Sequence, residues 1–274
     1  MIPDYRIPRP IRQGAGFVWT LVGAVHRFWR RGRRPVLAPP VLVVGALRAG
    51  GSGKTDCVAW IARRHPDLAL LVHPTGDEDR MLRGRFPGRV FVHRDLLGAW
   101  AAARSAGFVR GVSDGGLQDP ALDGCPALVL GRMRAEFHEL HPCGPYRQRR
   151  PARPVQLEVG MSGGWRWRHE IDLPHGSRVL VGAGVARTEN VVEDLRGMGV
   201  ETAAVVGAGD HRKFPSGQVE LLQKTFPTLP WVITAKDQAR GEAGRLRAPV
   251  HVLRRELEID PELACRIDAL VEAL

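Results

Sequence analysis

The sequence predicts an α/β fold in which a parallel sheet is covered by helices on both faces. Apolar stretches of strand length recur along the chain, and segments with helical periodicity lie between them. A glycine-rich loop directly follows the first of these strands and opens a helix. With 274 residues and 44% hydrophobic content, the chain is long enough to bury the cores of two modest domains.

The glycine-rich loop lies between a strand that starts at Val41 and a helix predicted at 56–64. Residues without Cβ let backbone N–H groups curl around phosphate oxygens, a lysine reaches the terminal phosphates, and a hydroxyl holds Mg²⁺. Arg48 replaces a glycine of the strict pattern, so this is a variant loop. A surface turn with an incidental lysine is the alternative, but the flanking strand and helix favour a P-loop NTPase-like domain. The loop residues are Gly50, Gly51, Ser52, Gly53, Lys54 and Thr55.

Acidic residues follow two of the other predicted strands. Asp114 follows the strand at 108–112 and is the expected Mg²⁺ partner, although an acid that begins a turn before two glycines is the alternative. Asp77 and Glu78 follow the strand at 68–72, where acids are usually only solvated. Ligands bind at the carboxyl ends of parallel strands, so these acids are site candidates. A further strand is expected at 89–93 and a helix at 96–104.

A second, smaller α/β domain is expected after a β-hairpin connector. Two strand-like stretches, 155–160 and 165–171, flank Ser162-Gly-Gly164 and predict the hairpin. Gly182-x-Gly184 lacks the third glycine of a dinucleotide fingerprint and is interpreted as a tight strand-to-helix turn. Strands are expected at 178–184, 201–206 and 231–234, and helices at 189–198 and 261–274. The predicted organisation is an N-terminal helix (1–34), a P-loop domain (35–152), the connector (153–175) and the second domain (176–274).

The N-terminal segment carries much of the positive charge. Residues 1–34 hold eight arginines and one acid, a net +7 of the formal +11. The uncharged run 14–25 rises about 18 Å as a helix, too short for about 30 Å of hydrocarbon. Trp19, Trp29 and the arginines favour binding to a membrane surface. A helix packed on the domain and a nucleic-acid contact are the alternatives; nucleic acid is not expected as a partner.

The four cysteines indicate a reducing compartment. Cys57, Cys125, Cys143 and Cys265 lie far apart and form no C-x-x-C pair. Neither a zinc site nor a disulfide framework is therefore predicted, and the cytoplasm is the expected location.

Five separated features of the chain point to one family: the basic N-terminal helix, the loop at 49–55, Gly76-Asp-Glu78, Asp114-Gly-Gly-Leu-Gln118 and Asp210-His211. Together they resemble the tetraacyldisaccharide 4'-kinases, which phosphorylate a lipid A precursor at the inner membrane. Two further segments are similar to family motifs, namely Pro142-Cys-Gly-Pro-Tyr-Arg147 and Thr234-Ala-Lys-Asp237. The resemblance extends from about residue 10 to the C-terminus.

The resemblance implies transfer of phosphate from ATP, with Mg²⁺, to the 4'-hydroxyl of tetraacyldisaccharide 1-phosphate, an acylated glucosamine disaccharide. The product would be lipid IVA, made at the cytoplasmic face of the bacterial inner membrane. Lys54 would stabilise the γ-phosphate, and Thr55 and Asp114 would hold Mg²⁺. Asp77 with His211 would activate the hydroxyl. Glu78, Gln118 and Arg147 are the expected substrate contacts, although Arg147 could equally be solvated surface charge.

Departures from the family pattern leave other functions open. Gly115 stands where the family has a second acid, Asp119 where it has histidine, and Ala235 where it has glutamate. The segment between the loop helix and Gly76 is also shorter than in the family. The alternatives are a P-loop kinase with another acceptor and a catalytically impaired homologue that binds nucleotide or lipid.

Overall fold

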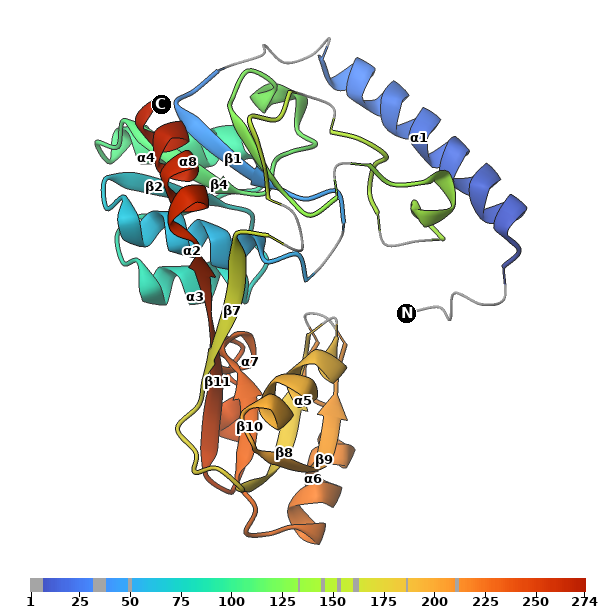
Figure 1. Ribbon diagram of the computed structural model, residues 1–274, viewed down its shortest axis with the longest axis vertical. Helices are drawn as coiled ribbons and strands as arrows, with labels where there is room; N and C mark the ends of the chain where they lie inside the picture. The colour runs from blue at the N-terminus through green and yellow to red at the C-terminus, as the bar shows by residue number, and fades with distance from the viewer. Residues whose placement is uncertain are drawn as a thin grey trace. The chain divides into compact units, whose positions relative to one another are not determined.

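The computed structural model divides into two compact units, each with its own sheet (Figure 1). The first unit comprises Met1–Pro74, Arg89–Trp165 and Ile259–Leu274, and the second comprises Thr75–Gly88 and Arg166–Glu258. The structure describes residues 7–31, 38–48, 51–132, 134–143, 146–151, 154–159, 163–185, 187–209 and 212–274.

The first unit is built on a six-stranded sheet in the order β3-β2-β4-β1-β5-β6. All five neighbouring pairs are parallel. Strands β1, β2 and β5 are buried along their whole length, as expected for a sheet that is covered on both faces. The predicted parallel α/β sheet is therefore confirmed. The strands are β1 (Val41–Gly45), β2 (Leu68–Val72), β3 (Val90–Val92), β4 (Arg110–Asp114), β5 (Ala127–Leu130) and β6 (Leu157–Val159).

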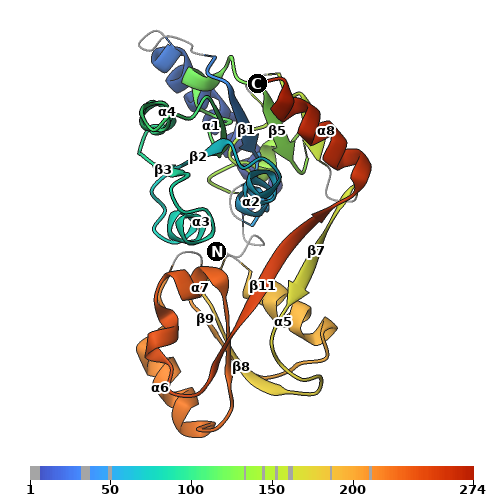
Figure 2. The ribbon, with the colours of Figure 1, turned by 90° about the vertical axis from the view of Figure 1, so that its left-hand side faces the viewer.

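Three helices of this unit pack near the sheet. Helix α2 (Lys54–Arg64) follows β1, and α4 (Leu96–Ser105) begins at Asp95, whose carboxylate accepts a hydrogen bond from the Leu97 N–H. The C-terminal helix α8 (Pro261–Glu272) lies beside α2, because Asp268 pairs with Arg64 and His65 (Figure 2). The described residues of this unit also form the short 3₁₀ turns η1 (Pro120–Leu122) and η2 (Phe137–Glu139).

Helix α1 (Arg9–Arg31) packs against η2 and leaves an apolar surface exposed. Gly16 permits the close approach, since a Cβ there would lie 1.8 Å from the Phe137 carbonyl oxygen. The Trp19 indole N–H donates to the Arg147 carbonyl at 2.8 Å. In the described part of the chain, no helix is long and apolar enough to cross a membrane. The exposed apolar side chains of α1 are Ile11, Phe17, Val18, Trp19, Leu21, Val22, Val25, Phe28 and Trp29.

The second unit contains a five-stranded sheet in the order β7-β11-β10-β8-β9. The pairs among β11, β10, β8 and β9 are parallel. The strands are β7 (Trp165–Glu170), β8 (Arg178–Ala183), β9 (Glu201–Gly207), β10 (Trp231–Thr234) and β11 (Val250–Ile259). The helices are α3 (Glu78–Arg85), α5 (Thr188–Gly197), α6 (Ser216–Thr225), α7 (Ala235–Ala239) and the 3₁₀ turn η3 (Glu242–Arg245).

The strand pairing expected within residues 153–175 does not occur. Strand β6 pairs with β5 in the first sheet, whereas β7 lies next to β11 in the second. Leu157 and Val159 are buried, so β6 extends the edge of the first sheet instead of turning back on β7. The connector hairpin is therefore a wrong prediction, because the partner of each strand is distant in sequence.

The observed units also differ from the expected boundaries at two places. Residues 75–88 group with the second unit, where Asp77 and Glu78 form ion pairs. Residues 259–274 group with the first unit through the contacts of α8 with α2.

Candidate active site

The glycine-rich loop turns directly into α2. Gly51 and Gly53 have φ of 60° and 78°, in the left-handed region that favours glycine, and Gly53 is the residue at which α2 is capped. The first-turn N–H groups of α2 lie at a helix N-terminus, which attracts anions through its dipole. Gly50 lies outside the described residues. The described part of the loop thus combines left-handed glycines with a helix N-terminus, two features that phosphate-binding loops use.

Lys54 is held close to this loop. Its ammonium group donates a hydrogen bond to the Ser52 hydroxyl at 2.9 Å, and its side chain is half-buried. A cation in this place can neutralise the terminal phosphates of a nucleotide that binds to the loop.

Thr55 and Asp114 form a buried pair beside the loop. The threonine hydroxyl donates to Oδ2 of the aspartate at 2.7 Å. The two residues meet because β1 and β4 are neighbours, with Val44 opposite Asp114. The Gly115 N–H also donates to the Val44 carbonyl at 2.9 Å, which continues the pairing of β1 and β4 one residue beyond Asp114. The structure therefore brings together the two residues that were predicted as metal ligands.

This pair suits Mg²⁺ by the chemistry of its donors. A hydroxyl and a carboxylate are hard oxygen ligands, and Mg²⁺ is usually held by one or two carboxylates together with substrate phosphates. Within the described residues, no group of three or more His, Cys, Asp or Glu could hold a metal without such a ligand. A metal here would thus be shared between Thr55, Asp114 and a bound phosphate.

The neighbouring Cys57 is chemically inert. Its side chain is buried on α2, and burial, together with the smaller effects of the negative charges of Asp114 and Asp56, raises the pKa of its thiol to about 12. The residue stays a neutral thiol near pH 7, so it is not a candidate nucleophile.

Two predicted substrate residues lie on segments that adjoin the loop. Gln118 is half-buried in the turn after β4, next to Leu117, which packs on Gly45. The Arg147 N–H donates to the Leu47 carbonyl at 2.9 Å, while its side chain is exposed. The backbone of Arg147 therefore joins the segment that leads into the loop.

Asp77 and Glu78 lie in the second unit, at the start of α3. The Asp77 carboxylate accepts one hydrogen bond from the Glu78 N–H at 2.9 Å and another from Arg240 at 3.1 Å, and Asp77 is 1% exposed. Glu78 forms an ion pair of 2.5 Å with Lys236. His211 lies outside the described residues.

Sequence reasoning missed Arg240 and Lys236 as the partners of these acids. A signal was available, because the Thr234-Ala-Lys-Asp237 motif contains Lys236, and Arg240 stands three residues after Asp237, a spacing at which helical side chains meet. What the sequence could not show is that these cations reach acids about 160 residues away.

A parallel sheet with a glycine-rich loop between β1 and α2, and a buried hydroxyl–carboxylate pair beside it, defines an α/β protein of the P-loop class. No family model matches the sequence. The tetraacyldisaccharide 4'-kinase of Halorhodospira halophila is 32% identical over 308 residues, which cover 95% of this chain and 90% of the relative. The chain therefore belongs to the tetraacyldisaccharide 4'-kinase family, and the predicted resemblance is confirmed.

Two further similarities agree with this assignment. The tetraacyldisaccharide 4'-kinase of Rhodopseudomonas palustris is 29% identical over 304 residues, covering 90% of this chain and 89% of the relative. The crystal structure of LpxK from Aquifex aeolicus in complex with ATP superposes with a TM-score of 0.66. The superposition covers 96% of this chain and 99% of that one at 16% identity, so it shows a shared fold.

Proposed function

We propose that this protein is an ATP- and Mg²⁺-dependent kinase that phosphorylates the 4'-hydroxyl of tetraacyldisaccharide 1-phosphate and yields lipid IVA. The observation that carries the proposal is the buried Thr55–Asp114 pair beside a phosphate-binding loop. Membership of the tetraacyldisaccharide 4'-kinase family supports the choice of acceptor.

The first unit supplies the nucleotide site of this proposal. When bound, ATP supplies the γ-phosphoryl group and Mg²⁺ neutralises phosphate charge. The backbone of Gly50, Gly51, Ser52 and Gly53 would surround the phosphates, and Lys54 would place its positive charge at the γ-phosphate. Thr55 and Asp114 would hold the metal through their oxygens. These residues align and neutralise charge, which is most of what phosphoryl transfer requires.

The acceptor chemistry is assigned to Asp77 and His211. The 4'-oxygen forms a bond to the γ-phosphorus while the bond from that phosphorus to its bridging oxygen breaks, and ADP leaves. We assign the hydroxyl proton to Asp77 acting together with His211, since a carboxylate coupled to an imidazole would be a suitable proton acceptor. Glu78, Gln118 and Arg147 are assigned to binding the substrate.

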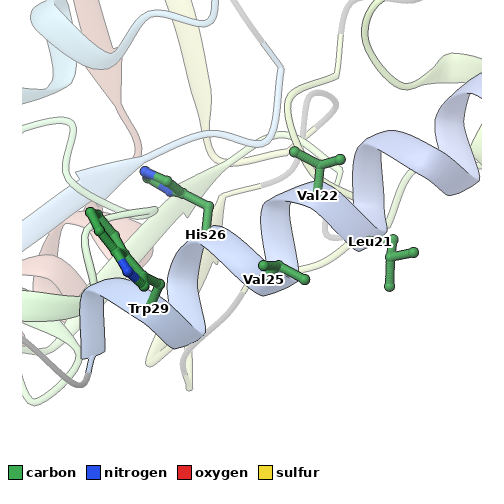
Figure 3. A pocket seen from close by; sticks show the side chains of 5 residues that line it. All are labelled: Leu21, Val22, Val25, His26 and Trp29. Atoms are coloured by element: carbon green, nitrogen blue, oxygen red, sulfur yellow. The ribbon is translucent and has the colours of Figure 1, made fainter.

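Helix α1 would hold the enzyme at the surface that contains its lipid substrate. Leu21, Val22, Val25, His26 and Trp29 line a shallow apolar pocket on this helix (Figure 3). Exposed apolar side chains and basic residues together bind anionic membrane surfaces. The proposed location is therefore the cytoplasmic face of the bacterial inner membrane, without a role for nucleic acid. Deleting residues 1–34 should abolish sedimentation with anionic phospholipid vesicles, and unchanged sedimentation would contradict this assignment.

The test of the reaction is transfer of ³²P from γ-labelled ATP to tetraacyldisaccharide 1-phosphate in detergent micelles with Mg²⁺. The wild type should form a bisphosphorylated lipid, and Lys54→Ala and Asp77→Ala should not. Full activity of Lys54→Ala would contradict the phosphate site, and full activity of Asp77→Ala would contradict the assigned base.

A catalytically impaired homologue is the second candidate, favoured by Gly115. The family has an acid at this position, but Gly115 has φ of 96° and no side chain that could bind a metal or orient water. A folded wild type that binds ATP but transfers no phosphate to this lipid would favour that candidate, or a kinase with another acceptor.

A further inference from the structure

Arg240 lies between two buried carboxylates of the second unit. One guanidinium nitrogen, Nη1, donates to Oδ2 of Asp77 at 3.1 Å. The other, Nη2, donates to Oδ1 of Asp237 and to the Gly184 carbonyl, the latter at 2.8 Å. The side chains of all three charged residues are less than a tenth exposed. A single cation thus joins the start of α3 to the end of α7.

The far side of this arrangement is fixed by hydrogen bonds to Asp237. The Thr234 hydroxyl donates to Oδ2 of Asp237 at 2.6 Å, and the Gly184 N–H donates to Oδ1 at 2.9 Å. Thr234 and Asp237 also form the capping box of α7. The motif Thr234-Ala-Lys-Asp237 therefore builds a rigid support for the guanidinium of Arg240.

Gly184 explains how the guanidinium comes so close to the backbone. A Cβ at this position would lie 2.4 Å from Nη2 of Arg240, closer than carbon and nitrogen atoms can approach. The absent side chain leaves room for Arg240, and the guanidinium fills that room. Gly182-x-Gly184 is thus a close-packed turn, in agreement with its interpretation from the sequence.

We infer that Arg240 is a positioning residue for phosphoryl transfer, acting through Asp77. This inference rests on the proposed function, which assigns Asp77 to the proton of the 4'-hydroxyl. Oδ1 of Asp77 is already engaged by the Glu78 N–H, so the bond from Arg240 to Oδ2 sets the rotation of the carboxylate. Arginine suits this task because its planar fork reaches two acceptors in fixed directions, which lysine cannot do.

The experiment compares Arg240→Gln and Arg240→Lys with the wild-type full-length protein in the lipid phosphorylation assay. Arg240→Gln should lower kcat about 100-fold, since a displacement of about 1 Å in a reacting group has effects of this size. Its KM for ATP should stay within about twofold, because the phosphate loop belongs to the first unit. Arg240→Lys keeps the positive charge, so its kcat should be about tenfold higher than that of Arg240→Gln, although still below that of the wild type.

Arg245 provides a matched control in the same unit. Its guanidinium pairs at 2.6 Å with Glu242, a buried carboxylate three residues earlier, as Arg240 pairs with Asp237. Arg245→Gln should lower the melting temperature as Arg240→Gln does, while its kcat stays within about twofold of the wild type. A second control is the pair Asp77→Asn and Asp77→Asn/Arg240→Gln. If Arg240 acts through Asp77, the double variant is no slower than Asp77→Asn alone.

Each outcome supports or overturns the inference. Equal losses of kcat in Arg240→Gln and Arg245→Gln at equal melting temperatures would show that Arg240 has only a structural role, and would overturn the inference. A double variant Asp77→Asn/Arg240→Gln whose loss of kcat is the product of the two single losses would also overturn it, because Arg240 would then act independently of Asp77. If Arg240→Gln shows no melting transition, Arg240→Lys decides: a reduced kcat at an unchanged melting temperature supports the inference, and a wild-type kcat overturns it.

The inference and the proposed function fail in different ways. Full activity of Asp77→Asn would overturn the role of Asp77, and with it the inference. A wild type that transfers no phosphate would overturn the proposed function, and again the inference with it. An inactive Asp77→Asn beside a fully active Arg240→Gln overturns the inference alone.

Discussion

Thr55→Val tests the Thr55–Asp114 pair with little change in shape. Valine replaces the hydroxyl by a methyl group, so the packing of α2 is nearly preserved while the donor to Asp114 is lost. The carboxylate loses a buried hydrogen bond, and the proposed magnesium site loses the hydroxyl that we assign to it as a ligand. We therefore expect effects on both stability and catalysis.

The magnitude follows from the burial of the pair. Thr55 and Asp114 are 6% and 8% exposed, and a hydrogen bond to a charged group in such a place contributes about 1.5–3 kcal/mol. The free energy of unfolding should fall by about 2 kcal/mol. A loss of about 2–3 kcal/mol in transition-state stabilisation would reduce kcat/KM roughly 30- to 150-fold.

The assay combines urea unfolding, followed by circular dichroism, with initial rates measured over a range of Mg²⁺ concentrations. Thr55→Ser is the control, because it keeps the hydroxyl and loses one methyl group, at a cost of about 0.8 kcal/mol. Thr55→Val should require more Mg²⁺ for half-maximal rate, and Thr55→Ser should not. A wild-type Mg²⁺ dependence in Thr55→Val would refute the pair as a metal site.

Three further predictions concern stability and reactivity. The hydrogen bonds from Arg64 and, to a smaller extent, from His65 hold the pKa of Asp268 below its ordinary value of 3.8. The ionised Asp268 therefore adds about 0.5–1 kcal/mol to the free energy of unfolding above pH 3.8, and this stabilisation is lost as the pH falls below that value. The unfolding free energies of wild type and Asp268→Asn should therefore differ at pH 7 and converge below about pH 3.8, and a difference that persists at pH 2 would contradict the pairing. Iodoacetamide at pH 8 should label the exposed Cys265 of the native protein and leave the buried Cys57 unmodified, as read by mass spectrometry, because burial raises the pKa of the Cys57 thiol to about 12. Gly16→Ala should destabilise the protein by about 1–3 kcal/mol because its Cβ would meet the Phe137 carbonyl, whereas Gly14→Ala, which meets nothing within 4 Å, should be neutral or slightly stabilising in urea unfolding; equal effects would contradict the packing of α1.

Local features of the fold were predictable from the sequence. The strand, the glycine loop and the helix after it occupy consecutive residues, and their conformations depend on interactions within a few residues. Asp114 was predictable because a polar residue at the end of an apolar strand lies at the ligand-binding edge of a parallel sheet. The predicted strand at 68–72 coincides with β2, because a short run of apolar residues is also a local pattern.

Pairings between distant segments were not predictable. Strand β11 was not predicted, although it has ten residues and lies between β10 and β7 in the second sheet. The short strands β6 and β7 have the local pattern of a hairpin, but β6 pairs with β5 and β7 lies next to β11. An alternating pattern shows that a strand has a buried face and does not say which strand will cover its edge.

The sequence by itself determined the class of the protein and where its glycine-rich loop lies, because the loop, a lysine and a threonine occupy a span of six residues. Only the tertiary structure decided that α8 packs in the first unit, that residues 75–88 join the second, and that Arg240 holds Asp77 from 163 positions away. These arrangements depend on which buried charges and apolar surfaces come into contact when the chain folds. Contacts between residues far apart in sequence cannot be predicted from the spacing of residues within one segment.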